Sequence, residues 1–558
     1  MKSPKKLNLW IAIGLFILAL GLRGFGIGWG LQNDLHNQSY HPDELPIFAA
    51  SQQIVPTQGK FTPGFYNYGT LYLTVLRVAS DAVTAYTGGP AENDANSTWA
   101  WVSRIHQVGR WLSALCGAGT VVFVFLTLRR FVGQFGAVFG ALVPLVAPAF
   151  VVHSRFQTVD VPATFLLAAS TFFAVLLLPT EDDPEPKNLM RWAMLSGLFA
   201  GLSAGTKYTG ILVLATLVIA AFFGARKDWL KLSAAAIGVA LLSFVICTPG
   251  VVLDTTEFLT DFKYEMAHTS TGHGLVFVGT SSGFLYHISN LLVGIGPLLT
   301  LLGILGLGIG ARQKQPWIFA IIAFALLYFV LIGRAEVKFL RYTFPLIVGL
   351  AAGFGVFMDY CEKQPNLGRI GAALGIAGIG GIDPGGMRQA INLTLWMTGD
   401  DPRDSAVQYL RTQQGNVGIA SLPWFYTAPT YRNATLGPQA SLSSRLGEMQ
   451  ETANPPTVFF AQSPDDPYAF NLGLLEQTKP DRIAISSFEY GDPLRIKAAG
   501  IEPKDPVEKL LVDRAVTFME AIKKDYEIDK AFGIDGIRIH DLEYIRPELM
   551  VWKRKSTN

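Results

Sequence analysis

The sequence predicts a polytopic α-helical membrane protein that ends in a soluble α/β domain. Half of the 558 residues are hydrophobic and 16% are charged, whereas a soluble globular protein carries about 25% charged residues. The charges are unevenly spread, with 47 Asp, Glu, Lys and Arg residues in residues 1–400 and 41 in residues 401–558. Because the last long apolar run ends near residue 383, we expect a transmembrane domain over residues 1–384 and a soluble domain over residues 385–558.

The net charge and the cysteines exclude several classes of protein. A net charge of +2 over this length provides no basic face that would neutralise the phosphates of a nucleic acid, so we expect no nucleic-acid partner. The cysteines stand far apart in apolar segments without a Cys-x-x-Cys spacing, which indicates neither a disulfide framework nor a zinc site. They are Cys116, Cys247 and Cys361.

Apolar runs predict about eleven membrane-spanning helices. A helix of about 20 residues crosses a hydrocarbon core of about 30 Å, and most of the runs approach that length. The basic start of the chain resembles that of a signal peptide, but no small-residue cleavage site follows, so we expect the first run to be a retained helix. The runs cover residues 8–30, 105–128, 135–152, 163–180, 192–206, 209–224, 231–248, 284–310, 316–333, 342–358 and 368–383.

Lysine and arginine mark alternate loops between these runs. Because such residues accumulate on the cytoplasmic side, we place the loops that carry them in the cytoplasm. We therefore expect a multi-pass protein of the cytoplasmic membrane, with its active site and C-terminal domain extracytoplasmic. The cytoplasmic residues are Lys2, Lys5, Lys6, Arg129, Arg130, Lys187, Arg191, Arg226, Lys227, Lys231, Arg312, Lys314, Lys363 and Arg369. The external segments are residues 31–104, 153–162, 249–283, 334–341 and everything after about 384.

Elements outside the membrane follow from their patterns. The first external loop, residues 31–104, is too polar and too rich in proline to span the membrane. Its amphipathic run at residues 68–86 predicts a helix that lies at the membrane interface. In the soluble domain, short apolar runs predict strands and longer amphipathic patterns predict helices. The predicted strands cover residues 417–421, 457–460 and 483–487, and the predicted helices cover residues 404–413 and 506–524.

Two adjacent carboxylates, Asp43 and Glu44, follow the first span in the external loop. Neighbouring side chains of a regular backbone point in different directions, so the two groups are suited to different tasks. One of them is expected to act as a general base, and the other to orient a partner or a substrate hydroxyl. The alternative is a solvated turn, since Pro-Asp is common in loops.

A tight external loop between the third and fourth spans carries Arg155 and Asp160. Its short length predicts that both side chains lie near each other at the membrane surface. The alternative is an ion pair that only closes the loop.

The longer external loop, residues 249–283, carries Glu265, His268 and His273. Two histidines with a carboxylate suit a metal, but the i, i+5 spacing does not place them on one helical face. A flexible glycine-rich loop that contacts a sugar or a phosphate is the favoured interpretation.

Lysine and arginine residues in the predicted external loops are unusual, because membrane proteins concentrate these residues in their cytoplasmic loops. They include Lys207, in a turn between two short helices, and Lys338 with Arg341. Lys338 and Arg341 are three residues apart, which predicts that they share a helical face and meet one anion. That anion is either a headgroup of the bulk bilayer or a specific phosphate. With the carboxylates, these cations favour transfer of a group from a lipid-linked phosphate.

Four motifs, in order along the chain, support a family resemblance. They are Asp43-Glu44, Arg155 with Asp160-x-Pro162, Gly201-Leu-Ser-Ala-Gly-Thr-Lys207-Tyr208 and Lys338-Phe-Leu-Arg341-Tyr342-x-x-Pro345. With these motifs on one predicted side of the membrane, residues 8–360 resemble the polytopic glycosyltransferases of the GT-C fold. Within that fold they resemble the group of protein O-mannosyltransferases and lipid A aminoarabinose transferases. The Trp-Trp-Asp-Tyr-Gly signature of oligosaccharyltransferase catalytic subunits is absent, which argues against en bloc transfer to asparagine.

The resemblance implies a chemistry and a set of roles. Its members transfer a sugar from a polyprenyl- or dolichyl-phosphate donor and usually invert the anomeric centre. The implied partners are such a donor, the membrane lipid, and an acceptor hydroxyl on a lipid, a glycan or a protein. Some members bind a divalent metal ion and others do not need one, which leaves a metal open and no cofactor certain. The resemblance assigns Asp43 as the catalytic base and Glu44 as a residue that supports either this base or the donor. It places Asp160 and Arg155 in the same cavity. It assigns the donor phosphate to Lys207, Lys338 and Arg341, and the substrate loops to His268, His273 and Tyr342.

Two other classes of protein compete with the transferase hypothesis. A transporter or flippase of a lipid-linked sugar places its polar site near the membrane midplane, on broken helices and in repeated halves. Here the candidate groups gather at one predicted surface, and no repeat of the hydropathy pattern is visible. A receptor or scaffold that binds a ligand through its C-terminal domain leaves the charges of the first 400 residues without a role.

Overall fold

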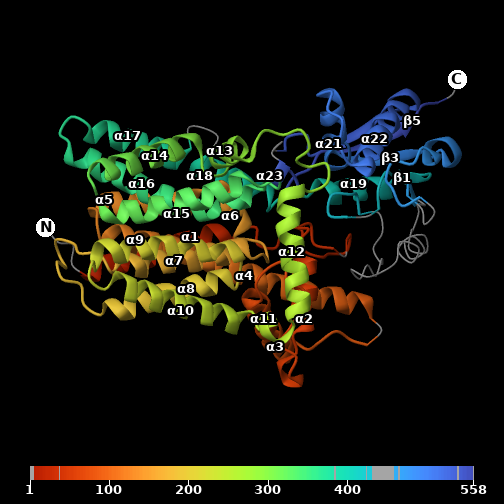
Figure 1. Ribbon diagram of the computed structural model, residues 1–558. Coiled ribbons are helices and arrows are strands. Elements are labelled where there is room, and N and C mark those ends of the chain that lie inside the picture. Colours follow the sequence, from red (N-terminus) through yellow and green to blue (C-terminus); the bar gives the residue numbers. More distant parts are fainter. Residues whose placement is uncertain are drawn as a thin grey trace.

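The structure is a computed structural model that describes residues 5–36, 38–92, 94–381, 385–422, 424–429, 458–462, 466–536 and 540–556. Most of these residues form a bundle of roughly parallel helices, and a small α/β domain is stacked against one end of the bundle (Figure 1). The described part of the chain begins at the opposite end (Figure 1). This division into a helical part and a sheet-containing part confirms the predicted fold class.

Every apolar run predicted to span the membrane contains a helix of the bundle, within the described residues. Residues 382 and 383 of the last predicted run lie outside them. The bundle helices are α1 (Lys5–Gly24), α4 (Ala95–Arg129), α5 (Gln134–Val146), α6 (Pro148–His153), α7 (Asp160–Val175), α8 (Leu189–Ala204), the 3-10 turn η2 (Tyr208–Val213), α9 (Leu214–Gly224), α10 (Trp229–Cys247), α13 (Gly283–Gly294), α14 (Pro297–Arg312), α15 (Pro316–Gly333), η3 (Leu340–Thr343), α16 (Phe344–Lys363), α17 (Gly368–Gly380) and α18 (Gly386–Trp396).

Length and composition qualify five of the described helices to cross a membrane alone, so the predicted number of eleven spans stays a prediction. The apolar run predicted over residues 284–310 is not one straight helix, because α13 and α14 meet there at an angle of 113°, as in a broken span or a re-entrant loop. The break has a local cause. Gly296 adopts a φ of 122°, and Pro297 has no N–H to continue the hydrogen bonds of α13.

Small residues let the bundle helices approach closely. A Cβ atom on Gly197 of α8 would lie 2.2 Å from the backbone oxygen of Ala236 in α10. Likewise, a Cβ atom on Gly306 of α14 would lie 1.7 Å from the backbone oxygen of Gly353 in α16. Within a bilayer, where apolar side chains gain nothing from leaving water, this close backbone packing is a main source of helix association. The glycines of these runs therefore specify which helices become neighbours.

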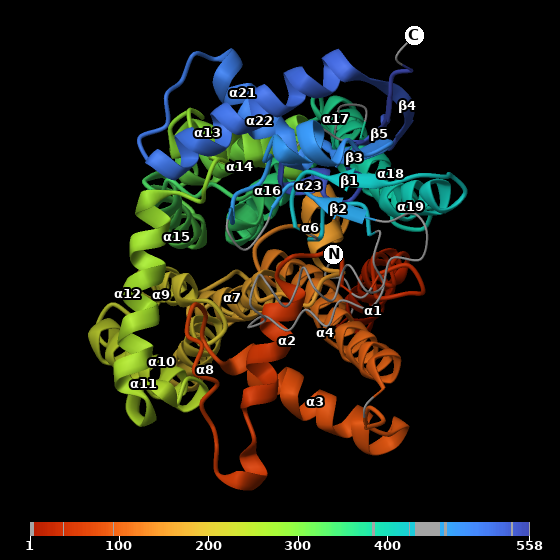
Figure 2. The same ribbon diagram turned by 90° about the vertical axis from the view of Figure 1, so that its right-hand side faces the viewer.

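The end of the bundle that meets the α/β domain also carries the long loops (Figures 1 and 2). The first loop forms α2 (Glu44–Gln53) and α3 (Leu71–Thr87), separated by the short turn η1 (Pro56–Gln58). The helix predicted over residues 68–86 is thus present as α3. The segment 249–283, predicted as a flexible glycine-rich loop, instead contains α11 (Gly250–Leu253) and the 17-residue helix α12 (Thr255–Thr271). Its residues from Thr255 to Thr271 contain no glycine or proline, so nothing in them interrupts a helix.

The α/β domain is built on a five-stranded sheet with the order β2-β1-β3-β5-β4. Strand β1 pairs in parallel with β2 and with β3, whereas β5 runs antiparallel to both β3 and β4. All three predicted strands are present, although Thr457 lies outside the described residues. The strands are β1 (Val417–Ile419), β2 (Val458–Phe460), β3 (Arg482–Ser486), β4 (Tyr526–Phe532) and β5 (Leu549–Arg554). The helices are α19 (Pro402–Arg411), the short π-helix η4 (Leu474–Thr478), α21 (Ser487–Ala498), α22 (Pro506–Asp525) and α23 (His540–Glu543).

The two parts are joined through α18, which lies just beyond the predicted boundary at residue 384. Arg155, at the end of the third predicted span, donates to the Thr394 hydroxyl of α18 at 2.6 Å and to the Met397 sulfur at 3.3 Å. Helix α18 is thereby bonded to the bundle. Helix α19 is the first helix that packs with the strands, since Ala406, Val407 and Leu410 share an apolar cluster with Val417 and Leu549.

Candidate active site

Four of the predicted site residues form one chain of charged contacts. The Arg341 guanidinium lies 3.4 Å from an Asp43 carboxylate oxygen and 3.8 Å from an oxygen of Asp160. The other Asp160 oxygen lies 2.5 Å from Lys207 Nζ. The chain thus runs from Asp43 through Arg341 and Asp160 to Lys207, with carboxylates and cations alternating.

Each of these side chains stands at the end of a helix, on the same end of the bundle. Asp43 immediately precedes α2, and Asp160 is the first residue of α7. Both carboxylates are therefore stabilised by the positive end of a helix dipole. Lys207 follows α8 at its turn into η2, and Arg341 lies in η3 directly before α16. The helix ends, rather than a flexible loop, fix the four groups.

A close backbone contact fixes the turn that carries Lys207. The N–H of Leu71 donates to the backbone oxygen of Gly205 at 2.9 Å. A Cβ atom on Gly69 would lie only 2.2 Å from that oxygen, so only glycine fits at this position. The Tyr208 hydroxyl adds donation to the backbone oxygens of Tyr66 and Tyr68, at 2.7 and 3.0 Å. The first external loop and the Lys207 turn therefore form one unit.

A fifth charged residue, Asp541, reaches the site from the α/β domain. Its carboxylate accepts from the Arg341 side chain at 3.2 Å and from the Arg341 backbone N–H at 3.2 Å. Arg341 is thus shared by three carboxylates, of Asp43, Asp160 and Asp541, while Lys207 is the second cation of the cluster. With the carboxylates ionised, the cluster carries more negative than positive charge.

The Asp43 carboxylate is partly exposed, with 25% of its side chain accessible. Burial raises its pKa, but the positive charges of Arg341 and Lys207 outweigh burial and hold the pKa of Asp43 below its usual value. Asp43 is therefore a carboxylate at neutral pH, ready to accept a proton. Burial also lowers the pKa of the neighbouring His41 to about 4, so that this imidazole is neutral at pH 7.

Glu44 has a different environment from Asp43. Its side chain and that of Arg110 in α4 are both inaccessible to solvent and form a two-pronged pair, with both N–O distances 2.7 Å. Glu44 also accepts from the Gln157 backbone N–H at 2.9 Å, and Arg110 donates to the backbone oxygens of Ile27 and Trp29 at 2.7 and 2.6 Å. Glu44 thus joins α2 to α4 and to the α6–α7 loop, and Arg110 extends the contact to the segment after α1. The predicted task of orienting a partner or a substrate hydroxyl stays a prediction.

A cavity of about 610 Å³ opens directly above Asp43, between the bundle and the α/β domain. Its floor includes His41, Asp43 and Arg341, and its wall includes residues from the loop 272–280 and from the α/β domain. A second, narrow cleft on the other side of Arg341 is lined by Asp160, Lys207 and residues of α7, α8, α15 and α16. Arg341 therefore separates a roomy cavity beside Asp43 from a tight cleft beside Lys207.

Comparison with known proteins agrees with this geometry. Residues 103–252, which include Asp160 and Lys207, match the family model described as dolichyl-phosphate-mannose-protein mannosyltransferase. The structure is similar to that of the oligosaccharyltransferase AglB from Archaeoglobus fulgidus in complex with an inhibitory peptide and a dolichol-phosphate. The TM-score is 0.50 at 11% identity, over 88% of this chain and 71% of AglB. The chain has the GT-C fold of membrane glycosyltransferases. This confirms the resemblance inferred from its motifs.

A second similar structure is ArnT from Cupriavidus metallidurans bound to undecaprenyl phosphate. Here the TM-score is 0.48 at 15% identity, over 98% of this chain and 97% of ArnT. No curated protein sequence matches the chain.

Two predicted members of the phosphate site of this GT-C protein lie elsewhere, and both predictions are corrected. Arg155 is fully buried and donates to the backbone oxygens of Leu22 and Arg23, so it joins α1 to α18 rather than pairing with Asp160. Lys338 does not share a helical face with Arg341, because α15 ends at Gly333 and η3 begins only at Leu340. Its Nζ instead donates to the Thr280 hydroxyl and the Ser281 backbone oxygen, both at 3.1 Å.

The predicted substrate-loop residues lie around the cluster. His268 and His273 approach each other to 3.1 Å between ring nitrogens, because α12 ends at Thr271 and the chain turns back there. The two histidines therefore do not share a helical face, as the spacing predicted, but the turn brings their rings together. His273 lines the large cavity, and Tyr342 lies under Lys207, whose Nζ is 4.3 Å from the ring centroid. Among the described residues, no group of three or more His, Cys, Asp and Glu side chains is arranged to hold a metal ion.

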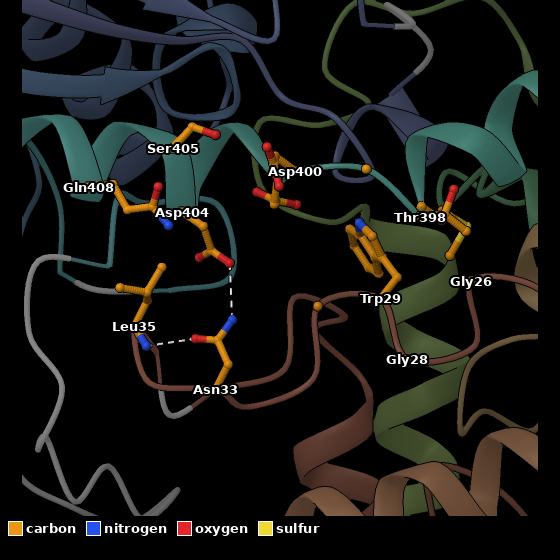
Figure 3. Close-up of a pocket in the computed structure, with 14 residues that line it drawn as sticks. Gly26, Gly28, Trp29, Asn33, Leu35, Thr398, Asp400, Asp404, Ser405 and Gln408 are labelled. Atoms are coloured by element: carbon orange, nitrogen blue, oxygen red, sulfur yellow. Dashed lines mark hydrogen bonds between the residues drawn. The ribbon is translucent and has the colours of Figure 1, made fainter.

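A separate groove of about 490 Å³ lies between the loop after α1 and the start of α19 (Figure 3). In it, Asn33 donates to Asp404 at 3.1 Å and accepts from the Leu35 N–H at 2.7 Å. The Tyr40 hydroxyl also donates to Asp404, and the Arg403 guanidinium lies 3.6 Å from the Tyr40 ring centroid. These contacts hold the loop that leads to Asp43 against the α/β domain, so we assign the groove a structural role.

Sequence reasoning missed three functional contributors: Arg110, Asp541 and Arg403. Arg110 lies inside an apolar run, where a charge is costly and marks a position with a specific partner, so its signal was present. Asp541 and Arg403 lie in a domain with abundant charges and carry no distinguishing local pattern.

Proposed function

We propose that this protein transfers a sugar from a polyprenyl-phosphate donor to a hydroxyl acceptor at the outer face of the cytoplasmic membrane. The observation that carries the proposal is the chain of contacts Asp43–Arg341–Asp160–Lys207 at one end of the bundle. It puts a carboxylate that can accept a proton beside two cations that can hold a phosphate. The family match over residues 103–252 and the GT-C fold support a donor of this class.

In the proposed reaction, Asp43 accepts the proton of the acceptor hydroxyl. The acceptor oxygen forms a bond to the anomeric carbon while the bond between that carbon and the phosphate oxygen breaks. The polyprenyl phosphate leaves with the electron pair, and Lys207 and Arg341 offset its negative charge. Asp43 lies in the cavity on one side of Arg341, and Lys207 lies in the cleft on the other. Attack from the side opposite the phosphate inverts the anomeric centre.

Binding of the donor phosphate also prepares the base. While Arg341 faces Asp43, its charge keeps the pKa of Asp43 low, which makes the carboxylate a weak base. A phosphate that binds Arg341 offsets that charge, so the pKa of Asp43 rises toward its usual value. The base becomes effective when the donor is present. Asp160 holds Lys207 and Arg341 together and is a positioning residue in this scheme.

The test is sugar transfer in proteoliposomes with radiolabelled polyprenyl-phosphate sugars. Asp43→Asn, which keeps the size of the side chain and removes its basicity, is expected to lower kcat by about 10²- to 10⁴-fold. The matched control is Asp34→Asn, in the same loop but exposed. Full activity of Asp43→Asn contradicts the assignment of the base. The sidedness is tested with Asp34→Cys in intact cells, where a membrane-impermeant thiol reagent is expected to label the new cysteine from outside.

Transport of a lipid-linked sugar is the competing function, and it is less well supported. A transporter places its polar site near the midplane, whereas the charged cluster here lies at one end of the bundle under the α/β domain. Counterflow of labelled donor across proteoliposomes without any covalent product would favour transport.

A further inference from the structure

The wall of the large cavity includes the ends of two parallel strands of the α/β domain. Ser421 lies just after β1, and Glu489 lies just after β3, in the first turn of α21, and both line the cavity. In open α/β sheets, ligands bind outside the carboxyl ends of the strands, where successive connections leave in opposite directions. In the order β2-β1-β3-β5-β4, the chain leaves β1 toward β2 and leaves β3 toward β4 and β5. The cavity lies at this switch point, between β1 and β3.

A buried carboxyl group stands at the switch point. The Ser421 hydroxyl donates to Glu489 Oε1 at 2.6 Å and so joins the ends of β1 and β3. The Ser486 backbone N–H donates to the other oxygen at 2.8 Å. Glu489 is 7% exposed, and burial raises its pKa to about 7. Near neutral pH this group exists partly as the acid, which both donates and accepts hydrogen bonds, as a hydroxyl ligand requires.

Flat aromatic side chains surround this carboxyl group. The Tyr426 and Phe488 rings stack at 5.9 Å with an interplanar angle of 4°, and Phe425 meets Phe488 edge-on at 5.4 Å. Trp424, also in the cavity wall, is 37% exposed. Such faces offer apolar contact area with little conformational entropy to lose. The wall therefore suits a ligand with both apolar faces and hydroxyl groups.

The charge of the wall narrows the class of ligand further. Among the described lining residues, the ionisable acids from the α/β domain are Glu489, Asp492 and Asp541. Asp492 pairs with Arg495 at 3.0 Å, and Asp541 pairs with Arg341 at 3.2 Å. The cation of the described lining is Arg341, which comes from the bundle and belongs to the proposed phosphate site. No lysine or arginine of the α/β domain among the described lining residues is placed to bind a phosphate or carboxylate group of a ligand, which favours a neutral ligand.

We propose that the α/β domain binds a neutral saccharide as the acceptor, against the aromatic and acidic wall formed by Trp424, Phe488 and Glu489. The inference rests on the proposed transfer, since it names the acceptor class of that same site. Ligand pockets typically measure about 300–1,000 Å³, so the cavity of about 610 Å³ accommodates a small saccharide. One end of the ligand then rests on the wall while a hydroxyl at the other end faces Asp43.

The experiment measures binding without a donor, so that it does not depend on transfer. The full-length protein in lipid nanodiscs is titrated with neutral hexose di- and trisaccharides, and binding is followed by saturation-transfer NMR. Trp424→Ala is expected to weaken saccharide binding about tenfold, the loss of a good aromatic contact. The matched control is Phe61→Ala, which removes an aromatic side chain that is 48% exposed and lies outside the cavity lining. It is expected to bind as the native protein does.

The outcomes separate the two proposals. Saccharide binding that Trp424→Ala weakens and Phe61→Ala does not supports the inference. Saccharide binding together with no transfer from any polyprenyl-phosphate sugar contradicts the proposed function and leaves the binding site standing. Absence of saccharide binding, equal binding by the two variants, or binding of a serine- and threonine-rich peptide instead of the saccharides overturns the inference.

Discussion

Replacing Glu44 by glutamine is expected to lower stability strongly while leaving the chemistry of the site intact. In the native protein, Arg110 and Glu44 are both inaccessible to solvent and paired through two N–O contacts of 2.7 Å. An amide in place of the carboxylate leaves the guanidinium charge buried without a counter-ion. Removal of one partner of such a buried pair costs about 3–5 kcal/mol. The pKa of Glu44 reflects the strength of this ion pair. Burial raises the pKa, but the charge of Arg110 outweighs burial and lowers the pKa to about 2.

The pH dependence of this contribution follows from the direction of the shift. The pKa of Glu44 in the folded protein is about 2, below its ordinary value of 4.5. The carboxylate therefore stabilises the fold fully above about pH 4.5, and this contribution is lost as the pH falls from there toward 2. In Glu44→Gln, the free energy of unfolding should therefore no longer show the loss that Glu44 causes as the pH falls from about 4.5 toward 2.

The assay is thermal unfolding in nanodiscs, followed by intrinsic fluorescence, beside transfer activity measured well below the melting temperature. Glu44→Gln should melt far below the native protein, and Glu44→Gln with Arg110→Met should recover part of the loss, because no unpaired charge remains. Glu476→Gln, at an exposed position, should melt as the native protein does. If Glu44→Gln melts like the native protein but no longer transfers sugar, Glu44 acts in catalysis and the structural assignment fails.

Three further predictions concern the donor, the base and the packing. Lys207→Met should raise the KM for the donor by about 10- to 100-fold, the loss of one charge-assisted contact to phosphate; an unchanged donor KM would remove Lys207 from the phosphate site. Because the pKa of Asp43 is lowered in the free protein, kcat/KM should stay constant down to below about pH 4 and fall only there. The value of kcat should fall at a higher pH, because the bound donor phosphate offsets the charge of Arg341 and raises the pKa of Asp43. A fall of kcat/KM that begins near pH 6 would contradict this. Gly69→Ala, whose Cβ would lie 2.2 Å from the Gly205 oxygen, should lower the melting temperature, with a cost of at least about 1–3 kcal/mol, whereas Gly14→Ala, with no atom within 4 Å, should not.

The sequence predicts the helical part of this fold well, because bilayer-length apolar runs have few alternatives. It does not predict the bend at 284–310, where a Gly-Pro pair breaks one run into two helices without changing its hydropathy. In the α/β domain, neither β4 nor β5 was predicted. Strand β5 lies inside the sheet between β3 and β4, and β4 is the outer of the two. Strand β4 lies at the edge of the sheet, and its sequence Tyr-Glu-Ile-Asp-Lys-Ala-Phe carries three charges, as an edge strand exposed to water does.

At the site, the sequence predicts which residues share one end of the bundle but not where each side chain points. Asp43, Asp160, Lys207 and Arg341 were predicted together and are found together. Arg155 lies in the same external loop as Asp160, yet its guanidinium turns to the carbonyl groups of α1. The topology rule that placed it on this side of the membrane contains no information on such directions.

The contribution of the α/β domain could not be predicted, because it depends on contacts between distant parts of the chain. Asp541 reaches Arg341 across 200 positions of sequence, and Asp404 reaches Tyr40 across 364. Through these two contacts the domain holds both the cation of the cluster and the loop that leads to Asp43. Deletion of the domain would therefore disturb the reacting groups as well as any acceptor site. Its two roles can be separated only by a substitution such as Trp424→Ala, which changes the cavity wall and leaves both of these contacts in place.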